Sequence, residues 1–464
     1  MNRAATQITR RSFLAGTALA GTVTLSEKTA EGALHTPERR EARPPPAEKV
    51  NLAVVGAGGR GADDMSDLSA AGVNFVALCD CDRRSAAESF HRYPDARQYT
   101  DWRKMLDQEK GIDAVLVATP DHNHAIVSIA AMRRGKHVYC EKPLAHSIWE
   151  VRQMAKVAAE TGVATQMGTQ GHAFEGTRRA VEVVRAGAIG DVTELHVWTD
   201  RPAGWWPQGI LRPKETPPIP EGLDWDVWLG PAAWRPYNPA YVPFVWRGFW
   251  NFGTGAIGDM GIHNLDTAYW GLELGAPTTV EVKDCSPIMT APAMKETAPL
   301  WSVIEFHFPA RGVRPPVRMT WYDGGKLPPK ELFQGEPLIS KDGGSLIIGS
   351  KGTLFTRTWH GGENDSDMFV LLPRKQFEGF QPPAPTLPRT PGHHQEWINA
   401  CRGQGKPLSN FGYASGLTEA LLLGNLALRT GKKIEWDARK MHAVNCPEAD
   451  PFIHPQFRKG WALD

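Results

Sequence analysis

The sequence predicts an α/β protein whose first domain contains a doubly wound parallel sheet. Residues 49–55 form a short apolar run rich in β-branched side chains, as a buried strand does, and a glycine-rich turn and a helical segment at 62–70 follow it directly. The same alternation of strands and helices then continues, which is typical of a parallel sheet with helical crossovers. Further strands are expected at 74–78, 112–118, 137–140 and 163–167.

The turn after the first strand has the glycine spacing of a dinucleotide-binding loop. Residues 56–61 read GAGGRG, which matches GxGxxG between a predicted strand and a predicted helix. In such a turn Gly56 permits the tight bend, Gly58 lets the backbone approach a pyrophosphate, and Gly61 allows the helix to pack closely on the strand. The helix N-terminus then faces the anion. The motif therefore predicts a Rossmann domain, which we place at residues 50–172.

An acidic residue at the end of the second predicted strand indicates which dinucleotide is bound. Asp80 lies about 20 residues beyond the glycines, where a carboxylate accepts hydrogen bonds from the ribose hydroxyls. Because a carboxylate repels a 2′-phosphate, the sequence favours NAD over NADP. Arg83 and Arg84 follow closely and could bind such a phosphate, which leaves NADP as the alternative.

The composition argues against several other classes of protein. The formal net charge is +1, so no overall positive field would attract nucleic acid or anionic lipid. The GxxxxGK[ST] loop of kinases and ATPases does not occur in the sequence. None of the six cysteines belongs to a CxxC pair or to a Cys/His cluster with zinc spacing, so no metal is expected.

The first 49 residues have the pattern of a twin-arginine export signal followed by a disordered spacer. Arg10 and Arg11 precede Ser-Phe-Leu and a mildly apolar run at 15–25 that is too short for a permanent membrane anchor. Residues 26–49 hold several prolines and mixed charges, as disordered segments do. The pattern predicts a periplasmic protein that the twin-arginine machinery exports already folded; a chance arginine pair is the alternative.

Four motifs together resemble the Gfo/Idh/MocA family, named for glucose–fructose oxidoreductase and inositol dehydrogenase. They are the GAGGRG turn, Ala-Thr-Pro at 118–120 with His124, Cys-Glu-Lys-Pro at 140–143, and Asp-Met-Gly-Ile-His at 259–263. The resemblance extends from about residue 50 to the end of the chain. It implies cofactor contacts from Gly56, Gly58, Gly59, Arg60, Gly61, Asp80, Thr119, Pro120, His124, Glu141 and Lys142.

The resemblance also implies the nature of the second domain. In this family that domain is α+β, with an open, mostly antiparallel sheet whose face closes over the nicotinamide, and residues 173–410 are expected to form it. Residues 411–429 have a helical pattern, and the C-terminal part at 411–464 is expected to pack back on the core. A homo-oligomer is implied by the resemblance alone. Strands are expected at 191–200, 279–283, 302–308 and 317–322.

Three side chains carry the expected chemistry. Lys142 follows a strand at the cofactor edge and can donate a hydrogen bond to the oxygen that reacts. Asp259 and His263 are four residues apart, which places both on one face of a helix, where the carboxylate can orient the imidazole that takes the alcohol proton. In the family the matching Lys, Asp and His are the catalytic set. The alternatives are a surface lysine, and an ordinary helical aspartate beside a structural histidine.

Substrate contacts are expected beyond the last Rossmann strand and from a tryptophan-rich loop. Gln170 and His172 follow that strand, and Asp266 lies on nearly the same helical face as the predicted catalytic aspartate. Eight tryptophans fall between residues 198 and 250, in a segment rich in Pro and Gly, and rings such as Trp206 could stack on a sugar. The same rings could instead form a small core of the loop or an oligomer interface.

The predicted function is hydride transfer between a hydroxyl carbon of a sugar, or of a sugar derivative, and a tightly bound nicotinamide. Tight binding is expected because free NAD is scarce outside the cytoplasm, so an exported enzyme that released NADH at each turnover would stall. The alternative is a redox-neutral glycoside hydrolase or lyase, in which oxidation at C3 permits elimination at C1 before water addition and reduction. A cofactor-binding regulator is disfavoured because Lys142, Asp259 and His263 are all retained.

Overall fold

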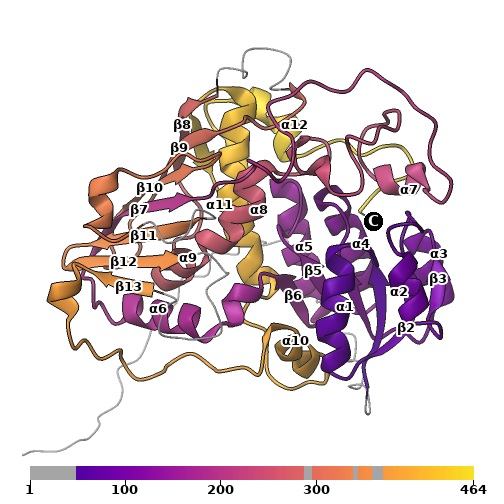
Figure 1. Cartoon of the computed structure of the whole chain (residues 1–464), viewed down its shortest axis with the longest axis horizontal. Helices are drawn as coiled ribbons and strands as arrows, with labels where there is room; N and C mark the ends of the chain where they lie inside the picture. The colour runs from indigo at the N-terminus through magenta and orange to yellow at the C-terminus, as the bar shows by residue number, and fades with distance from the viewer. Residues whose placement is uncertain (1–48, 287–294, 338–342, 358–368, 464) are drawn as a thin grey trace, which may run out of the picture. The chain divides into compact units, whose positions relative to one another are not determined.

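The computed structural model describes residues 49–286, 295–337, 343–357 and 369–463 (Figure 1). The predicted export signal and nearly all of the predicted spacer lie outside these described residues. Within the described part of the chain, no helix combines the length and apolarity needed to cross a membrane.

The first domain is a six-stranded parallel sheet with the strand order β3-β2-β1-β4-β5-β6. Its central strand β1 pairs with β2 on one side and with β4 on the other, so the strand order reverses next to the glycine-rich turn. The predicted parallel sheet is therefore confirmed. The strands are β1 (Asn51–Val55), β2 (Asn74–Cys79), β3 (Arg97–Tyr99), β4 (Ala114–Val117), β5 (His137–Glu141) and β6 (Thr165–Gly168).

Five helices connect these strands, and their ends follow ordinary capping chemistry. The Ser147 hydroxyl accepts a hydrogen bond from the Glu150 backbone N–H at the start of α5, and Gly162 closes its end in the left-handed conformation. The helices are α1 (Arg60–Ala70), α2 (Ala87–Arg92), α3 (Trp102–Gln108), α4 (Asp121–Arg133) and α5 (Ile148–Thr161).

The second sheet has nine strands in the order β13-β12-β11-β7-β10-β9-β8-β14-β15. Only β7 and β10 pair in parallel among the strands described, so the sheet is mostly antiparallel, as expected. The strands are β7 (Val192–Trp198), β8 (Thr279–Cys285), β9 (Ser302–Phe308), β10 (Val317–Tyr322), β11 (Gly344–Gly349), β12 (Gly352–Arg357), β13 (Phe369–Leu372), β14 (Ile434–Asp437) and β15 (His442–Ala443).

The helices outside the Rossmann domain include the two that carry Asp259, His263 and Asp266. Short 3₁₀ turns η1 (Gln170–Ala173) and η2 (Val245–Gly248) also contribute to the site. The helices are α6 (Glu175–Arg185), α7 (Trp225–Leu229), α8 (Gly255–Asn264), α9 (Asp266–Leu272), α10 (His393–Cys401), α11 (Phe411–Thr430) and α12 (Asp450–Ile453).

The long helix α11 runs between the two sheets and fixes the position of α8 (Figure 1). A Cβ atom at Gly261 of α8 would lie 2.6 Å from the Leu421 side chain of α11, so the glycine permits this close packing. On its other side, α11 receives two hydrogen bonds from Arg152 of α5 through the Glu419 carboxylate, at 2.6 and 2.7 Å. The geometry of α8 relative to the Rossmann sheet therefore depends on α11.

Part of the tryptophan-rich segment, including Trp225, Trp228 and Trp246, forms a core of its own. Trp225 and Trp228 stack with ring centroids 4.7 Å apart, and Tyr241 and Phe252 pack in the same buried cluster. This arrangement matches the alternative in which the aromatic rings serve the loop's own packing.

Candidate functional site

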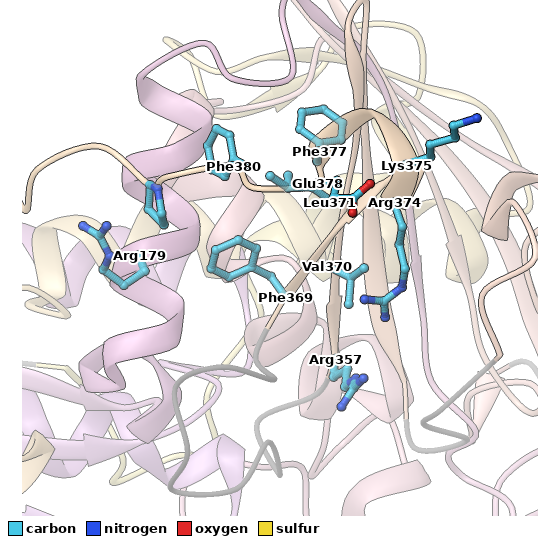
Figure 2. A pocket seen from close by; sticks show the side chains of 11 residues that line it. Arg179, Arg357, Phe369, Val370, Leu371, Arg374, Lys375, Phe377, Glu378 and Phe380 are labelled. Atoms are coloured by element: carbon cyan, nitrogen blue, oxygen red, sulfur yellow. The ribbon is translucent and has the colours of Figure 1, made fainter.

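A cavity of about 630 Å³ lies at the carboxyl ends of the Rossmann strands. Residues that follow β1, β2, β4 and β5 line one part of it, and residues of α8 and η2 line another. Ligands of open α/β sheets bind at this edge. A second cavity of about 670 Å³, lined by residues that include Phe369, Phe377 and Arg374, shares no lining residue with the first (Figure 2).

The glycine-rich turn is shaped for a dinucleotide. Gly56 has φ +88°, which favours glycine, and a Cβ atom at Gly61 would lie 1.8 Å from the Gly56 carbonyl oxygen. The Gly58 N–H donates to the Asp80 carboxylate at 3.0 Å, so this acidic group braces the turn while it lines the cavity. The donor set and the space left by the glycines fit the pyrophosphate and ribose of a dinucleotide.

Lys142 and Asp259 form a close ion pair at the other end of this cavity. The Lys142 Nζ lies 2.7 Å from Asp259 Oδ1 and 3.0 Å from the Asp259 carbonyl oxygen. Arg201 donates to Asp259 Oδ2 at 2.7 Å, and Arg247 Nε lies 3.4 Å from Oδ1. Burial alone would raise the pKa of Asp259, but these three cations hold it far below its usual range. The carboxylate is therefore ionised and fixed.

His263 lies one helical turn after Asp259 on α8 and lines the same cavity. Its Nδ1 is 3.4 Å from the Thr169 hydroxyl, which follows β6. Burial, and then the positive charge of Lys142, lower the pKa of His263 well below its usual value, while the Asp259 charge raises it. The imidazole is therefore neutral near pH 7, as a general base must be.

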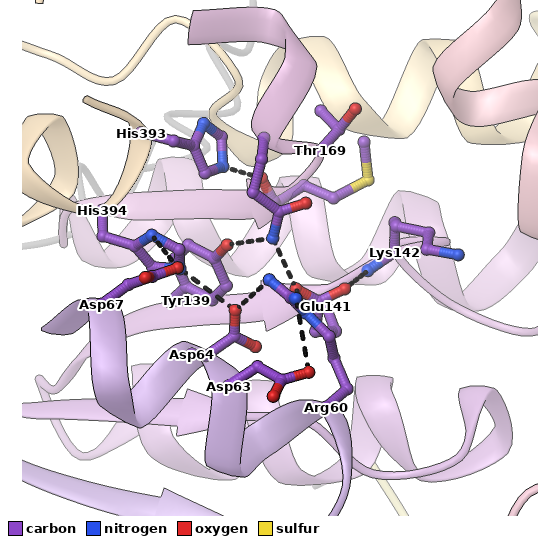
Figure 3. A network of polar contacts seen from close by, with 12 residues as sticks. Arg60, Asp63, Asp64, Asp67, Tyr139, Glu141, Lys142, Thr169, His393 and His394 are labelled. Carbon is purple, nitrogen blue, oxygen red and sulfur yellow. Dashed lines mark hydrogen bonds and ion pairs between the residues drawn. The ribbon is translucent and has the colours of Figure 1, made fainter. Parts of the chain in front are cut away.

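Glu141 links the cofactor turn to the catalytic end of the cavity (Figure 3). It accepts hydrogen bonds from Arg60 Nε at 3.4 Å and from Gln170 Nε2 at 2.9 Å. Burial and the nearby Asp64 raise the pKa of Glu141 to about 7. Gln170 also donates to the Tyr139 hydroxyl at 3.0 Å, so its amide supports this buried network even though Gln170 lines the cavity.

The network continues away from the cavity to helix α10. Arg60 donates to Asp64 Oδ1 at 2.5 Å, and His394 Nε2 lies 3.1 Å from the same oxygen (Figure 3). Asp64, Asp67 and His394 bring three possible metal-ligand atoms within 4.8 Å of one another. Because the Arg60 guanidinium already contacts Asp64, we assign this cluster to packing between α1 and α10.

Three of the predicted substrate residues do not line the cavity. His172 Nδ1 and Asp266 Oδ2 pair at 2.8 Å in a buried position, and the His172 ring stacks on Trp270 with centroids 3.9 Å apart. Trp206 is also buried, and its indole N–H donates to Gln208.

His124, predicted as a cofactor contact, is likewise buried and does not line the cavity. Its two ring nitrogens lie 2.8 Å from the Thr119 and Pro143 carbonyl oxygens, so it positions the main chain next to the cavity. Thr119 and Pro120 themselves line the cavity, as do Gly56, Gly58, Gly59 and Arg60.

Two arginines and three aromatic rings complete the catalytic end. The arginines and Phe244 were not predicted as site residues, whereas Trp205 and Trp246 belong to the tryptophans expected to include sugar-stacking rings. Arg201 packs over Trp205 with its guanidinium carbon 4.0 Å from the ring centroid. Arg247 lies 4.2 Å from the centroid of Phe244 and 4.5 Å from that of Trp246. All five line the cavity. The signal in the sequence is an arginine close to tryptophan within the tryptophan-rich segment, since Arg247 follows Trp246 and Arg201 lies four residues before Trp205.

Fold and site define an NAD-binding oxidoreductase. Residues 50–169 match a family model described as the oxidoreductase family, NAD-binding Rossmann fold, and residues 205–309 match one described as the oxidoreductase family, C-terminal alpha/beta domain. The chain belongs to the Gfo/Idh/MocA oxidoreductase family.

Curated relatives and solved structures agree with this assignment. Inositol 2-dehydrogenase of Salmonella typhimurium is 27% identical over 151 residues, 32% of this chain and 45% of that protein. Levoglucosan dehydrogenase of Pseudarthrobacter phenanthrenivorans is 27% identical over 188 residues, 39% of this chain and 38% of that protein. These alignments span less than half of each relative.

The same fold occurs in the WlbA dehydrogenase of Bordetella pertussis, solved with NADH and UDP-GlcNAcA. That structure has a TM-score of 0.56 at 20% identity and covers 84% of this chain and 99% of its own. A levoglucosan dehydrogenase solved with NADH and L-sorbose has a TM-score of 0.53 at 17% identity, covering 84% and 99%. At these identities the likeness shows the fold.

Asp80 is expected to make NADH binding depend on pH. Burial raises its pKa to about 6, although the backbone N–H groups of Asp82 and Gly58 lower it in part. Since the ionised carboxylate accepts hydrogen bonds from the ribose, the dissociation constant for NADH should rise as the pH falls below about 6, by up to about tenfold per pH unit. Titration calorimetry at about pH 8 and about pH 5 measures this change.

Asp80→Asn should weaken NADH binding at high pH and remove most of this dependence. The control is Asp63→Asn, because Asp63 also lines the cavity but its side chain is 72% exposed.

Asp80→Ala should weaken the binding of NAD more than the binding of NADP, because the lost carboxylate no longer repels a 2′-phosphate. Equal losses for the two cofactors would contradict the predicted NAD preference.

Proposed function

We propose that this protein transfers a hydride between NAD and a hydroxyl-bearing carbon of a sugar or sugar derivative. The observation that carries the proposal is that Lys142, Asp259 and His263 line the same cavity as the glycine-rich turn and Asp80. A cofactor bound on the turn and a sugar bound beside α8 would therefore share one enclosed space.

Lys142, His263 and Asp259 would have different roles in the reaction. NAD, when bound, supplies the hydride acceptor. Lys142 is held by Asp259 with its ammonium facing the cavity, where it can donate a hydrogen bond to the reacting oxygen and stabilise negative charge there. His263 is the neutral base that takes the hydroxyl proton. Asp259 stays ionised, so its contribution is to fix the lysine.

A carbohydrate substrate is supported by the cavity walls and by the relatives. Trp205, Trp246 and Phe244 give the cavity flat apolar surfaces beside charged donors, which suits the C–H faces and hydroxyls of a sugar ring. Inositol 2-dehydrogenases and a levoglucosan dehydrogenase are among the similar proteins.

The test follows NADH formation with purified protein, added NAD and a panel of monosaccharides, inositols and simple glycosides. Reduction of NAD by at least one carbohydrate, abolished on removal of the substrate, is expected. If no carbohydrate reduces NAD and no ketone sugar oxidises NADH, net hydride transfer is ruled out. The proposal is then wrong unless the protein catalyses a redox-neutral reaction.

A redox-neutral glycoside hydrolase or lyase is the second candidate. A 2,7-anhydro-N-acetylneuraminate hydratase of Escherichia coli is 36% identical over 91 residues, 20% of this chain and 24% of that protein. In the redox-neutral reaction considered for this protein, the sugar is oxidised at C3 and loses the C2 proton and the C1 substituent. It then adds water and regains the hydride. Denaturation of the purified protein should then release tightly bound NAD, which mass spectrometry detects. Glycosides should turn over repeatedly without added cofactor and without accumulation of NADH.

We further propose that the protein is exported to the periplasm by the twin-arginine pathway, on the basis of Arg10, Arg11 and the residues that follow them. Replacing both arginines with lysine should retain the protein in the cytoplasm, as cell fractionation would show. A homo-oligomer is proposed from the family resemblance, and light scattering of the purified protein tests it.

A further inference from the structure

The catalytic end of the cavity holds more positive charge than the proposed chemistry requires. Lys142, Arg201 and Arg247 surround one carboxylate, that of Asp259. Two other acidic groups line the cavity near this end. Asp121 is bonded to the Thr254 hydroxyl at 2.8 Å, and burial raises its pKa to about 6. Glu141 is bonded to Arg60 and Gln170, and its pKa is raised to about 7. Three cations therefore contact Asp259, the carboxylate that is held ionised. A neutral alcohol substrate would add no negative charge beside them in this buried site.

Arg201 is buried but only partly satisfied. Its side chain is held by one hydrogen bond from Nη1 to Asp259 and by packing on Trp205. Its Nε has no hydrogen-bond partner among the described residues, although the residue is only 8% exposed. A charged donor that is buried without a partner is unfavourable unless a ligand or water accepts from it. The Arg201 guanidinium therefore has hydrogen-bonding capacity left for an anionic ligand group in the cavity that it lines.

Arg247 adds a second guanidinium to the same place. Its Nη1 donates to the Phe244 carbonyl oxygen at 2.9 Å, and its Nε contacts the other oxygen of Asp259. The structure gives Nη2 no partner among the described residues. Packing against Phe244 and Trp246 holds the group in one orientation, so little rotamer entropy is lost when a ligand binds. Both arginines thus present spare donors while sharing one carboxylate.

We propose that the substrate is a sugar acid, whose carboxylate binds between Arg201 and Arg247 while its reacting hydroxyl lies at Lys142 and His263. This inference rests on the proposed function and names its substrate class. Guanidinium groups match carboxylates by paired N–H donors, which is why arginine rather than lysine is used for such recognition. The carboxylate would supply the missing negative charge and fix which hydroxyl faces the nicotinamide.

The test compares matched sugars that differ only in the anionic group. Wild-type protein with NAD is assayed on methyl hexosides, the corresponding methyl hexuronides and the corresponding hexoside 6-phosphates in the gluco, galacto and manno series. The hexuronide of at least one series should have a kcat/KM about 10–100-fold above that of its neutral partner, as expected for hydrogen bonds to charged groups. Calorimetry with NADH-loaded protein should show the same order of affinity without any turnover.

Variants connect the preference to the two arginines. Arg247→Gln should bring the ratio of kcat/KM for acid over neutral sugar close to one, and Arg201→Gln should do the same. Because Arg201 is buried and its variant could unfold, Arg247→Gln, whose side chain is 19% exposed, is the decisive one. Arg318→Gln is the control, because Arg318 lies on β10, pairs with Glu194 and does not line the cavity. It should keep the wild-type ratio.

The outcomes separate this inference from the proposed function. Hydride transfer with equal kcat/KM for acid and neutral sugars would overturn the sugar-acid assignment and leave the proposed function standing. A preference for the phosphate esters, or an unchanged ratio in Arg247→Gln, would also overturn it. If no sugar of any class reacts or binds, the proposed function fails, and the inference fails with it.

Discussion

Lys142→Ala is expected to lower the rate of hydride transfer by about 10²–10⁴-fold, because it removes the donor that stabilises charge on the reacting oxygen. The fold should survive, because Arg201 and Arg247 still compensate the buried charge of Asp259. The loss should fall on kcat, since the interaction strengthens as the hydroxyl loses its proton. Steady-state assays of NADH formation measure it, and circular dichroism confirms the fold.

Lys156→Ala is the matched control for this variant. Lys156 lies on α5, its side chain is 64% exposed, and its nearest acidic group is 3.8 Å away. Its removal should leave kcat and KM unchanged. A Lys142→Ala enzyme that keeps a near-normal rate would show that the ammonium group does not act on the reacting oxygen.

The Rossmann domain could be predicted because its signals are local. The strand before Gly56, the glycine spacing and Asp80 all lie within about 30 residues, and one βαβ unit contains them. The short strand β3 could not be found in this way, since its three residues, Arg97 to Tyr99, carry no apolar alternation. The strand order of the second sheet was also beyond the sequence, because β7 pairs with β10 and β11, whose residues lie more than 100 positions later.

The site residues also differ in whether the local sequence pattern could predict them. Lys142, Asp259 and His263 were predicted because they stand at strand ends or on one helical face, where period and position define direction. Arg201 and Trp205 belong to irregular loop, which has no period from which a side chain's direction can be read.

For that reason the sequence could not choose between neighbouring rings. Trp205 lines the cavity, whereas Trp206, the ring predicted from the sequence to contact substrate, is buried against Gln208. The pairing of His172 with Asp266 joins residues 94 positions apart, which periodicity within either segment does not reveal. Such contacts depend on how α8 and α9 pack against the turn after β6.

His263→Ala is expected to lower kcat/KM by at least about 100-fold, because the alcohol then loses its general base. In the wild-type protein burial and Lys142 hold the pKa of His263 well below its usual value, so the neutral base is present throughout the neutral range. Protonation of His263 should therefore not limit the wild-type rate between about pH 7 and about pH 8. In the variant, proton removal falls to water or hydroxide, so the residual rate should rise with pH.

A structural role for His263 would give a different result, and added imidazole distinguishes the two. If the ring serves as the base, imidazole in solution should restore part of the rate to His263→Ala and none to Lys142→Ala, since only the first variant leaves a space that imidazole fills. A ring needed only for its contact with Thr169 would leave the variant unresponsive. Near-normal activity of His263→Ala would rule out the histidine as the base and leave Lys142, beside Asp259, as the group that accepts the proton.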